Sequence, residues 1–359
     1  MSWTPGWSSV SPREPGAVSR ERDAPEGGAA TASRETAEAG VGDVVNTLVE
    51  VRDLHVLVGR VEAVRGVSLD LPPGRRTGLI GESGSGKTLT ALALMGLLPQ
   101  GLRARGSVKL EGRELLGLPE RERARLRGDA MGMIFQEPLT ALDPVQRIGD
   151  AIAEPLRVHR GLSAQAARER VPALLRRVHM PDPEEKMRAY PHQLSGGQRQ
   201  RAMIAMAVAC DPRLVIADEP TTALDVTVQA RILTLLVGLV EEEGASLLLI
   251  THDLAVVSET CQDVYVMYGG RIVEQGSVDD VFSRPRHPYT AALLDAIPPV
   301  DEPVAGRRLA AIPGVVPGLG EFPTGCPFRN RCPRADQQCA QDPPLDGDGH
   351  LAACWHPVA

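Results

Sequence analysis

Short apolar runs and helix-patterned segments alternate along much of the chain. The continuous apolar runs 214–217 and 247–250 are typical of strands buried on both faces of a parallel sheet. Between them, residues 226–243 have a helical pattern that Asp225 can cap and Gly244 can end. A strand, a helix and a strand at this spacing form a βαβ unit, so the pattern predicts an α/β fold.

Further elements are predicted on both sides of this unit. A helical run over residues 87–98 ends before Pro99, because proline cannot continue a helix. Gly269 and Gly270 separate two short apolar runs and are typical of a two-residue hairpin turn. The additional predicted strands cover residues 48–51, 67–71, 76–80, 264–268 and 271–274.

The composition changes twice along the chain. Residues 1–45 are rich in Gly, Ala, Ser, Pro, Glu and Arg without apolar periodicity, which predicts a disordered tail. Residues 46–296 carry the strand and helix patterns and are predicted to form the main domain. After about Ala296, prolines and glycines become frequent and four cysteines follow. Residues 297–359 are therefore interpreted as a C-terminal extension.

Composition and charge narrow the classes of function. Aromatic residues make up 3% of the 359 residues and apolar residues 43%, so the core must be aliphatic. The net charge of −7 argues against a nucleic-acid-binding protein, which usually has a basic stripe. No apolar stretch reaches the roughly 20 residues that span a bilayer, and the N-terminus lacks the apolar core of a signal peptide. We therefore expect a cytoplasmic chain that reaches a membrane only through partners.

A phosphate-binding loop is predicted between the strand 76–80 and the helix that starts at residue 87. Its sequence fits G-x-x-x-x-G-K-S/T in the strand–loop–helix context that this pattern requires. Glycines let backbone N–H groups approach phosphate oxygens, and the helix N-terminus adds its dipole. Lys87 would neutralise the β- and γ-phosphates of ATP, and the Thr88 hydroxyl would bind Mg²⁺. The predicted ATP-binding residues are Gly81, Glu82, Ser83, Gly84, Ser85, Gly86, Lys87 and Thr88.

Two acids directly follow the buried strand 214–217. In open α/β sheets, ligands bind at the carboxyl ends of the strands. Asp218 is therefore predicted to hold Mg²⁺, and Glu219 to polarise the attacking water as a general base. Two acids at the end of a strand are a weak signal alone, but a strong one after a phosphate-binding loop.

A second anion-binding helix N-terminus is predicted where Leu-Ser-Gly-Gly-Gln opens the helical run 198–210. One nucleotide needs only one phosphate loop, so a second cradle requires an explanation. With this motif the chain resembles the ATP-binding cassette (ABC) family, whose signature is L-S-G-G-Q, over about residues 47–297. In that family the signature of one subunit closes on ATP held by the phosphate loop of another. The signature residues here are Leu194, Ser195, Gly196, Gly197 and Gln198.

The resemblance implies a fold and further site residues. The fold is an α/β P-loop NTPase cassette with a RecA-like core sheet, an antiparallel β subdomain and a helical subdomain, followed here by the cysteine-containing extension. Gln136 matches the Q-loop glutamine, which contacts Mg²⁺ and the attacking water. Asp225 lies in the D-loop, which crosses the dimer interface. His252 matches the switch histidine that touches the γ-phosphate, so the implied catalytic residues are Glu219, His252 and Gln136.

One departure from the family concerns the adenine base. ABC proteins usually stack adenine on an aromatic residue shortly before the phosphate loop. Here Val58 or Leu57 occupies that place, and no aromatic residue lies between Trp7 and Phe135. We therefore expect weak base stacking and loose selectivity among purines, with an unaffected triphosphate site.

The C-terminal part of the cassette is similar to one group within the family. Arg-His-Pro-Tyr-Thr at 286–290, with Ala-Ala-Leu-Leu after it, resembles the ATPases of dipeptide, oligopeptide and nickel importers, as does the segment 134–144. The predicted function is an ATP-hydrolysing subunit of an importer for di- or oligopeptides, with nickel or another small solute as the alternative. A soluble ABC ATPase acting on ribosomes or DNA is disfavoured. The chain has one cassette, and the segment between Gln136 and Ser195 is too short for an inserted coiled coil.

The resemblance also implies partners and a location. Two transmembrane permease subunits and a second ABC ATPase, identical or related, are expected to bind the chain directly. An extracytoplasmic substrate-binding protein would act through the permeases, and no nucleic acid is expected. The chain would then be a peripheral subunit at the cytoplasmic face of the cell membrane.

Four cysteines make the C-terminal extension a candidate metal site. Four thiols in a loop-rich segment favour a soft metal, but their spacing lacks the C-x₂-C pairs typical of structural zinc. In the importer group that the chain resembles, such a tail can hold an iron–sulfur cluster, and four thiolates suit [4Fe–4S]. Zinc and free thiols remain the alternatives. The cysteines are Cys326, Cys332, Cys339 and Cys354.

Overall fold

The computed structural model describes residues 47–222, 224–297 and 311–358. The predicted disordered tail, residues 1–45, lies outside the described residues, as does the segment 298–310 at the start of the predicted extension. Within the described part of the chain, no helix has the length and apolar character needed to cross a membrane.

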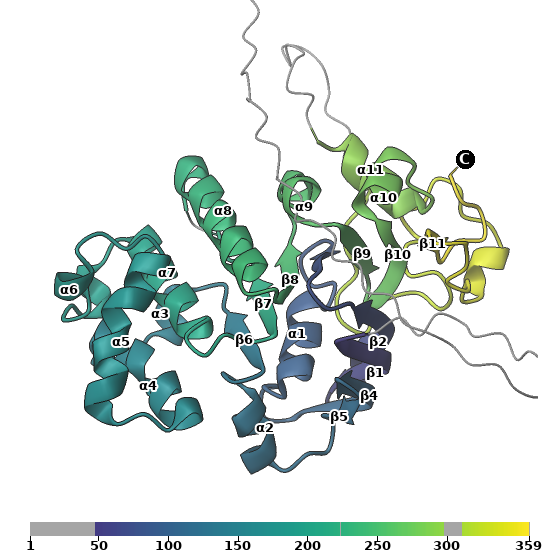
Figure 1. Ribbon diagram of the computed structural model, residues 1–359. Coiled ribbons are helices and arrows are strands. Elements are labelled where there is room, and N and C mark those ends of the chain that lie inside the picture. The colour runs from purple at the N-terminus through teal and green to yellow at the C-terminus, as the bar shows by residue number, and fades with distance from the viewer. Residues whose placement is uncertain (1–46, 223, 298–310, 359) are drawn as a thin grey trace, which may run out of the picture. The chain divides into compact units, whose positions relative to one another are not determined.

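A seven-stranded sheet forms the centre of the cassette (Figure 1). Five neighbouring strands are parallel, and the last two continue the sheet in antiparallel pairing. In spatial order the strands are β6 (Met131–Ile134), β7 (Leu214–Asp218), β8 (Ser246–Thr251), β3 (Arg76–Ile80), β9 (Asp263–Tyr268), β10 (Arg271–Ser277) and β11 (Leu351–Ala352). The sequence pattern predicted β7, β8, β3, β9 and β10 as strands but not their order in the sheet, and it did not predict β6 or the short β11 of the extension.

Alternate residues of the central strands face two different hydrophobic cores. On β7, Val215 and Ala217 belong to one core, whereas Leu214 and Ile216 belong to the other. Every residue of β7 and β8 is buried, because the sheet is covered on both faces. This two-sided burial is the reason that these strands are continuous apolar runs in the sequence.

A second, four-stranded antiparallel sheet forms the expected β subdomain. Its core residues, such as Val51 and Val67, share one hydrophobic core with Leu94 of helix α1 (Lys87–Met95) and with one face of the central sheet. The strands in spatial order are β2 (Val61–Leu71), β1 (Val49–Val58), β4 (Leu102–Leu110) and β5 (Arg113–Glu114). Helix α2 (Glu120–Leu126) follows β5 in the chain.

The expected helical subdomain follows β6. Apolar residues of its three longest helices, Ile152, Leu175 and Met203, are fully buried in the other hydrophobic core. Its helices are α3 (Pro138–Ala141), α4 (Ile148–Arg160), α5 (Ala164–Arg177), α6 (Pro183–Lys186) and α7 (Gly196–Ala207). The remaining helices of the described cassette are α8 (Val226–Glu242), α9 (Leu254–Thr260), α10 (Val278–Ser283) and α11 (Pro288–Asp295).

Two helix boundaries differ from the sequence prediction. Helix α1 ends at Met95, before the predicted residue 98, because Gly96 adopts a left-handed φ of 62° and its N–H bonds back to the helix. Helix α7 begins at Gly196, two residues before the predicted start at Gln198. Ser195 caps this helix, and the side chains of Ser195 and Gln198 form a reciprocal capping box.

The C-terminal extension packs directly against the cassette. Its strand β11 pairs with β10 through Glu274–Ala352 and Gln275–Leu351. Phe328 of the extension is buried in the same hydrophobic core as the central strands. The extension and the cassette therefore share one sheet and one core.

Candidate functional site

The predicted site residues follow four parallel strands whose carboxyl ends lie level at one edge of the central sheet. Ile80 of β3 pairs with Thr251 of β8, and Ile250 of β8 pairs with Asp218 of β7. This register brings together segments that are far apart in the sequence. The phosphate loop follows β3, Gln136 follows β6, Asp218 and Glu219 end or follow β7, and His252 follows β8.

The phosphate loop is held so close to neighbouring backbone that a side chain at either of two glycines would cause a clash or strain. A Cβ at Gly81 would lie 2.1 Å from the carbonyl oxygen of Met267. Gly86, with a φ of 103°, would place a Cβ 3.2 Å from the carbonyl oxygen of Ala63. The loop is therefore fixed by its packing, which keeps its backbone N–H groups available to an anion.

Lys87 lies inside the loop rather than in solvent. Its Nζ donates hydrogen bonds to the carbonyl oxygens of Gly81 (2.7 Å) and Glu82 (3.1 Å). Burial lowers the pKa of Lys87, and the nearby carboxylates of Glu219, Asp218 and Glu82 oppose that effect. A charged ammonium is thus held where phosphate oxygens would meet the loop.

One cavity of about 620 Å³ joins most of the predicted residues. All eight predicted ATP-binding residues line it, together with Gln136, Glu219 and His252. A cavity of this size can hold a nucleotide-sized ligand. The other residues that line it are Ala63, Ile80, Leu89, Leu254 and Leu293.

Thr88, which lines the cavity, and the adjacent Asp218, which does not, offer hard oxygen ligands. The Thr88 hydroxyl donates to Asp218 Oδ1 at 3.3 Å, and Asp218 is almost fully buried. Burial raises the pKa of Asp218, Glu219 adds to this effect, and the Thr88 hydrogen bond and Lys87 oppose it. A hydroxyl and a carboxylate side by side are the donors that Mg²⁺ prefers, so these residues fit the predicted metal.

Glu219 is the centre of a hydrogen-bonded group. Gln136 Nε2 and the Thr222 hydroxyl donate to Glu219 Oε2 at 3.2 and 2.9 Å, and His252 Nδ1 lies 3.1 Å from Oε1. Burial acts to raise the pKa of Glu219, but hydrogen bonds from His252 and Thr222, aided by the charge of Lys87, outweigh it and lower the pKa. The carboxylate is therefore ionised at neutral pH and able to accept a proton.

The backbone of Glu219 is unusual as well. Its φ is 44°, in the left-handed region that residues with a Cβ seldom adopt. Its N–H donates to the carbonyl oxygen of Ile250 at 2.8 Å, which holds this turn against β8. Strained backbone that the surrounding structure enforces is common at functional sites.

The signature motif lies away from this cavity. None of the residues 194–198 lines it; the motif instead contacts the start of α8 in the same chain. A Cβ at Gly197 would lie 2.9 Å from a methyl group of Val228. Asp225 caps α8 by accepting from the Val228 N–H at 3.0 Å, so it also lies outside the cavity.

Sequence reasoning missed three residues at this site. Thr222 bonds to Glu219, Tyr289 accepts from the backbone N–H of Glu82, and Arg331 pairs with the Glu82 carboxylate. Thr222 lies three residues after Glu219, so its position was a usable signal. Arg331 lies 249 residues from Glu82, and no local pattern connects the two.

No Phe, Tyr or Trp is found among the described residues that line the cavity, and neither Val58 nor Leu57 lines it. Base–aromatic stacking is worth about 1–3 kcal/mol, or up to about two powers of ten in affinity. We therefore expect ATP and GTP to bind within about tenfold of each other, as measured by competition against a fluorescent nucleotide. A hundredfold preference for ATP would mean that another residue supplies the stack.

Comparison with known proteins gives the family. The model of the family described as ABC transporter matches residues 64–222, and that described as oligopeptide/dipeptide transporter, C-terminal region, matches residues 273–339. The oligopeptide transport ATP-binding protein OppD of Salmonella typhimurium is 49% identical over 319 residues, which cover 87% of this chain and 95% of that protein. OppD of Escherichia coli is 48% identical over 319 residues, which cover 87% of this chain and 94% of that protein.

Solved structures agree with this result. A dimeric post-hydrolysis state of the ATP-binding cassette MJ0796 with ADP and phosphate has a TM-score of 0.57 and 28% identity, and it covers 64% of this chain and 98% of that one. Part of a Clostridium perfringens ABC transporter complex, cbiO1, has the same TM-score and 27% identity over 66% of this chain and 91% of that one. The chain therefore belongs to the ABC transporter family, as one of its ATPase subunits.

Proposed function

We propose that this chain powers the import of di- or oligopeptides across a membrane. The observation that carries the proposal is the 49% identity that extends over 95% of an oligopeptide transport ATP-binding protein. The match to the oligopeptide/dipeptide C-terminal region supports the same cargo, since it covers residues 273–339, from the end of the cassette into the extension. Nickel or another small solute is less well supported, because the OppD proteins of Salmonella typhimurium and Escherichia coli are both named for oligopeptide transport.

Within this proposal, the cavity binds ATP and its residues have distinct roles. Glu219 accepts the proton of the attacking water, and Gln136, Thr222 and His252 orient its carboxylate. Lys87 neutralises phosphate charge, and Thr88 with Asp218 would hold Mg²⁺. The metal would supply further neutralisation of the phosphates.

The position of the signature motif supports a two-subunit site. Residues 194–198 do not reach the cavity of their own chain, so they are free to close on the nucleotide of a second ATPase subunit. The N-terminus of α7 would present its helix dipole as an anion-binding end to such a partner. We place the assembled pair at the cytoplasmic face of the membrane, against two permease subunits that an extracytoplasmic binding protein supplies.

Peptide uptake by cells tests the proposed cargo. Cells that lack this chain should lose uptake of labelled tri- to pentapeptides, and the wild-type chain should restore it. The variant Glu219→Gln, made at equal level, should not restore it, because transport needs hydrolysis. Restored nickel uptake without restored peptide uptake would contradict the peptide assignment and favour the alternative cargo.

We further propose that the extension holds a [4Fe–4S] cluster. All four predicted cysteines line one narrow pocket. Burial, with smaller contributions from the other three thiols, raises the pKa of Cys326 to about 11. Cys326 and Cys339 are buried and Cys332 and Cys354 are half-buried, and a bound cation would stabilise such a group as thiolates.

Backbone N–H groups are directed at two of the sulfurs. The Arg334 N–H donates to Cys332 Sγ and the His356 N–H to Cys354 Sγ, both at 3.4 Å. In each case the donor lies two residues after the cysteine. Hydrogen bonds to sulfur are typical of cluster ligands, whose negative charge they stabilise.

A buried histidine beside the cysteines leaves one donor without a partner among the described residues. His287 lines the pocket, and its Nδ1 accepts from the Tyr289 N–H at 3.0 Å. Its proton must therefore lie on Nε2, which is buried without a partner among the described residues. An unpaired buried donor costs about 1–3 kcal/mol, whereas the sulfur of a bound cluster would accept this bond.

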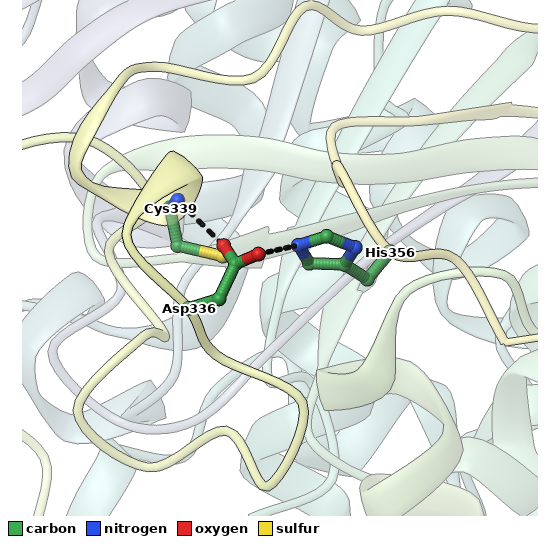
Figure 2. A group of neighbouring side chains, drawn as sticks. All are labelled: Asp336, Cys339 and His356. Carbon is green, nitrogen blue, oxygen red and sulfur yellow. Dashed lines mark hydrogen bonds and ion pairs between the residues drawn. The ribbon is translucent and has the colours of Figure 1, made fainter.

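Asp336 connects two parts of the cysteine site (Figure 2). It accepts from the backbone N–H of Cys339 at 3.3 Å, and its carboxylate lies 3.0 Å from His356 Nε2. Because His356 closely follows Cys354, this link holds two cysteine-bearing segments together before any metal binds. A cluster at this place would supply a covalent cross-link to a segment that is otherwise rich in loops.

A further inference from the structure

A buried ion pair connects the C-terminal extension to the phosphate loop. Arg331 Nη1 donates to Glu82 Oε2 at 2.7 Å and Nη2 donates to Oε1 at 3.2 Å, so the contact uses both carboxylate oxygens. The exposed fraction of the side chain is 6% for Arg331 and 25% for Glu82. Paired bonds of this kind fix the orientation as well as the distance of the two groups.

The guanidinium of Arg331 is held from several sides. Its Nε donates to the Pro313 carbonyl oxygen at 2.8 Å, and Nη1 also donates to the Tyr268 hydroxyl at 3.2 Å. The rings of Tyr268 and Phe328 lie within 6 Å of its centre, at 5.8 and 5.9 Å. Burial acts to lower the pKa of Arg331, but Glu82 and Tyr268 outweigh it, so the side chain stays charged.

The backbone of Glu82 is held by a second residue of the C-terminal part. The Glu82 N–H donates to the Tyr289 hydroxyl at 2.8 Å. Tyr289 is fully buried, and its ring centre lies 4.6 Å from that of Tyr268. Contacts from outside the phosphate loop therefore position both the side chain and the backbone of Glu82.

The position of Glu82 matters to the phosphate site for two reasons. Lys87 donates to the Glu82 carbonyl oxygen, so a shift of Glu82 would also move the ammonium. The Glu82 carboxylate itself lies beside a cavity built for a polyanion. Without Arg331, that negative charge would be unpaired and would repel phosphate oxygens.

We propose that Arg331 is a positioning residue for nucleotide binding, which neutralises Glu82 and fixes the start of the phosphate loop. The inference rests on the proposed nucleotide site. The extension would thus support ATP binding through Glu82, without touching ATP itself. By the reciprocity of linked binding, bound nucleotide also stabilises the docking of the Arg331 segment.

Steady-state kinetics of Arg331→Met in the purified ATPase tests this assignment. We expect the KM for ATP to rise about tenfold while kcat stays within about threefold, since the catalytic residues are untouched. Arg331→Lys should give an intermediate KM, because one ammonium keeps the charge but not the paired bonds. The matched control is Arg284→Met, which breaks an exposed Arg–Asp pair and should leave both constants unchanged.

A double variant distinguishes loss of the Arg331–Glu82 charge pair from a nonspecific loss of stability. Arg331→Met combined with Glu82→Gln should bind ATP at least fivefold more tightly than Arg331→Met alone, because no unpaired carboxylate remains. If the double variant binds no better, or if Arg331→Met has a wild-type KM, the inference is wrong. Should Arg331→Met fail to fold, the KM of Arg331→Lys decides in the same way.

The failure of the inference can be told apart from failure of the nucleotide site itself. Lys87→Ala should lose ATP binding, since the phosphates would lose their main counter-charge. If Lys87→Ala loses binding and Arg331→Met does not, only the role of Arg331 is refuted. If neither variant affects ATP binding, the nucleotide site is assigned to the wrong cavity.

Discussion

Glu219→Gln is expected to lower ATP hydrolysis by about a hundredfold or more while ATP binding is kept. The amide has nearly the same shape as the carboxylate, but it cannot accept the proton of the attacking water. Loss of a general base typically costs about two to four powers of ten in rate. The rate of phosphate release and the affinity for ATP can both be measured on one preparation of the purified subunit. The variant should also accumulate as an ATP-bound dimer, because the nucleotide that closes the pair is no longer removed.

A matched control tests whether replacing any glutamate by glutamine affects ATP hydrolysis. Glu259 is exposed near the end of α9 and does not line the cavity, so Glu259→Gln should hydrolyse ATP like the wild type. Hydrolysis by Glu219→Gln within threefold of the wild type would refute the assignment of the base. Loss of ATP affinity in the same variant would instead show that Glu219 mainly supports the phosphate loop.

Cys332→Ser is expected to remove the iron from the extension altogether. The wild-type chain, purified without oxygen, should be brown and contain about four iron atoms and four sulfides, as a [4Fe–4S] cluster requires. The variant should be colourless, because three thiolates with one hydroxyl hold the cluster poorly. Its extension should also become sensitive to protease, since metal binding would supply part of the folding energy of a loop-rich segment.

A cysteine outside the pocket provides the control for this experiment. Cys261 is buried in the cassette core and does not line the pocket, so Cys261→Ala should keep its iron. Wild-type protein with zinc and no iron would contradict the cluster and favour a mononuclear site. Asp336, Cys339 and His356, whose ligand atoms lie within 4.8 Å of one another, would then be the candidate ligands. Protein with neither metal would leave free thiols.

The sequence allowed the grouping of the candidate site residues to be predicted, because these residues lie in contiguous motifs. The phosphate loop, Asp218 and Glu219 each directly adjoin a strand, and parallel strands end at the same edge of a sheet. Their convergence therefore followed from the βαβ pattern. The boundaries of α1 and α7 were less accurate, because capping by Gly96 and Ser195 depends on backbone geometry that apolar periodicity does not report.

The contacts of the extension could not be predicted in the same way. Arg331 pairs with Glu82 across 249 residues, and such a pair has no spacing rule. The composition of residues 297–359, rich in Pro and Gly, indicated a loop-rich extension. In the structure Phe328 contributes to the core of the cassette, so the missing apolar partners come from outside the segment. Local composition alone cannot reveal burial of that kind.

The two-residue strand β11 has a consequence for solubility. It is the outermost strand beside β10, and the Ala353 N–H continues the contact by donating to the Val273 carbonyl oxygen at 2.8 Å. An uncovered edge strand presents unpaired backbone groups that can recruit the strand of another molecule. A chain that loses its last nine residues would therefore expose the β10 edge and acquire a route to self-association. We therefore expect the extension to limit aggregation of the cassette, independently of any metal that its cysteines bind.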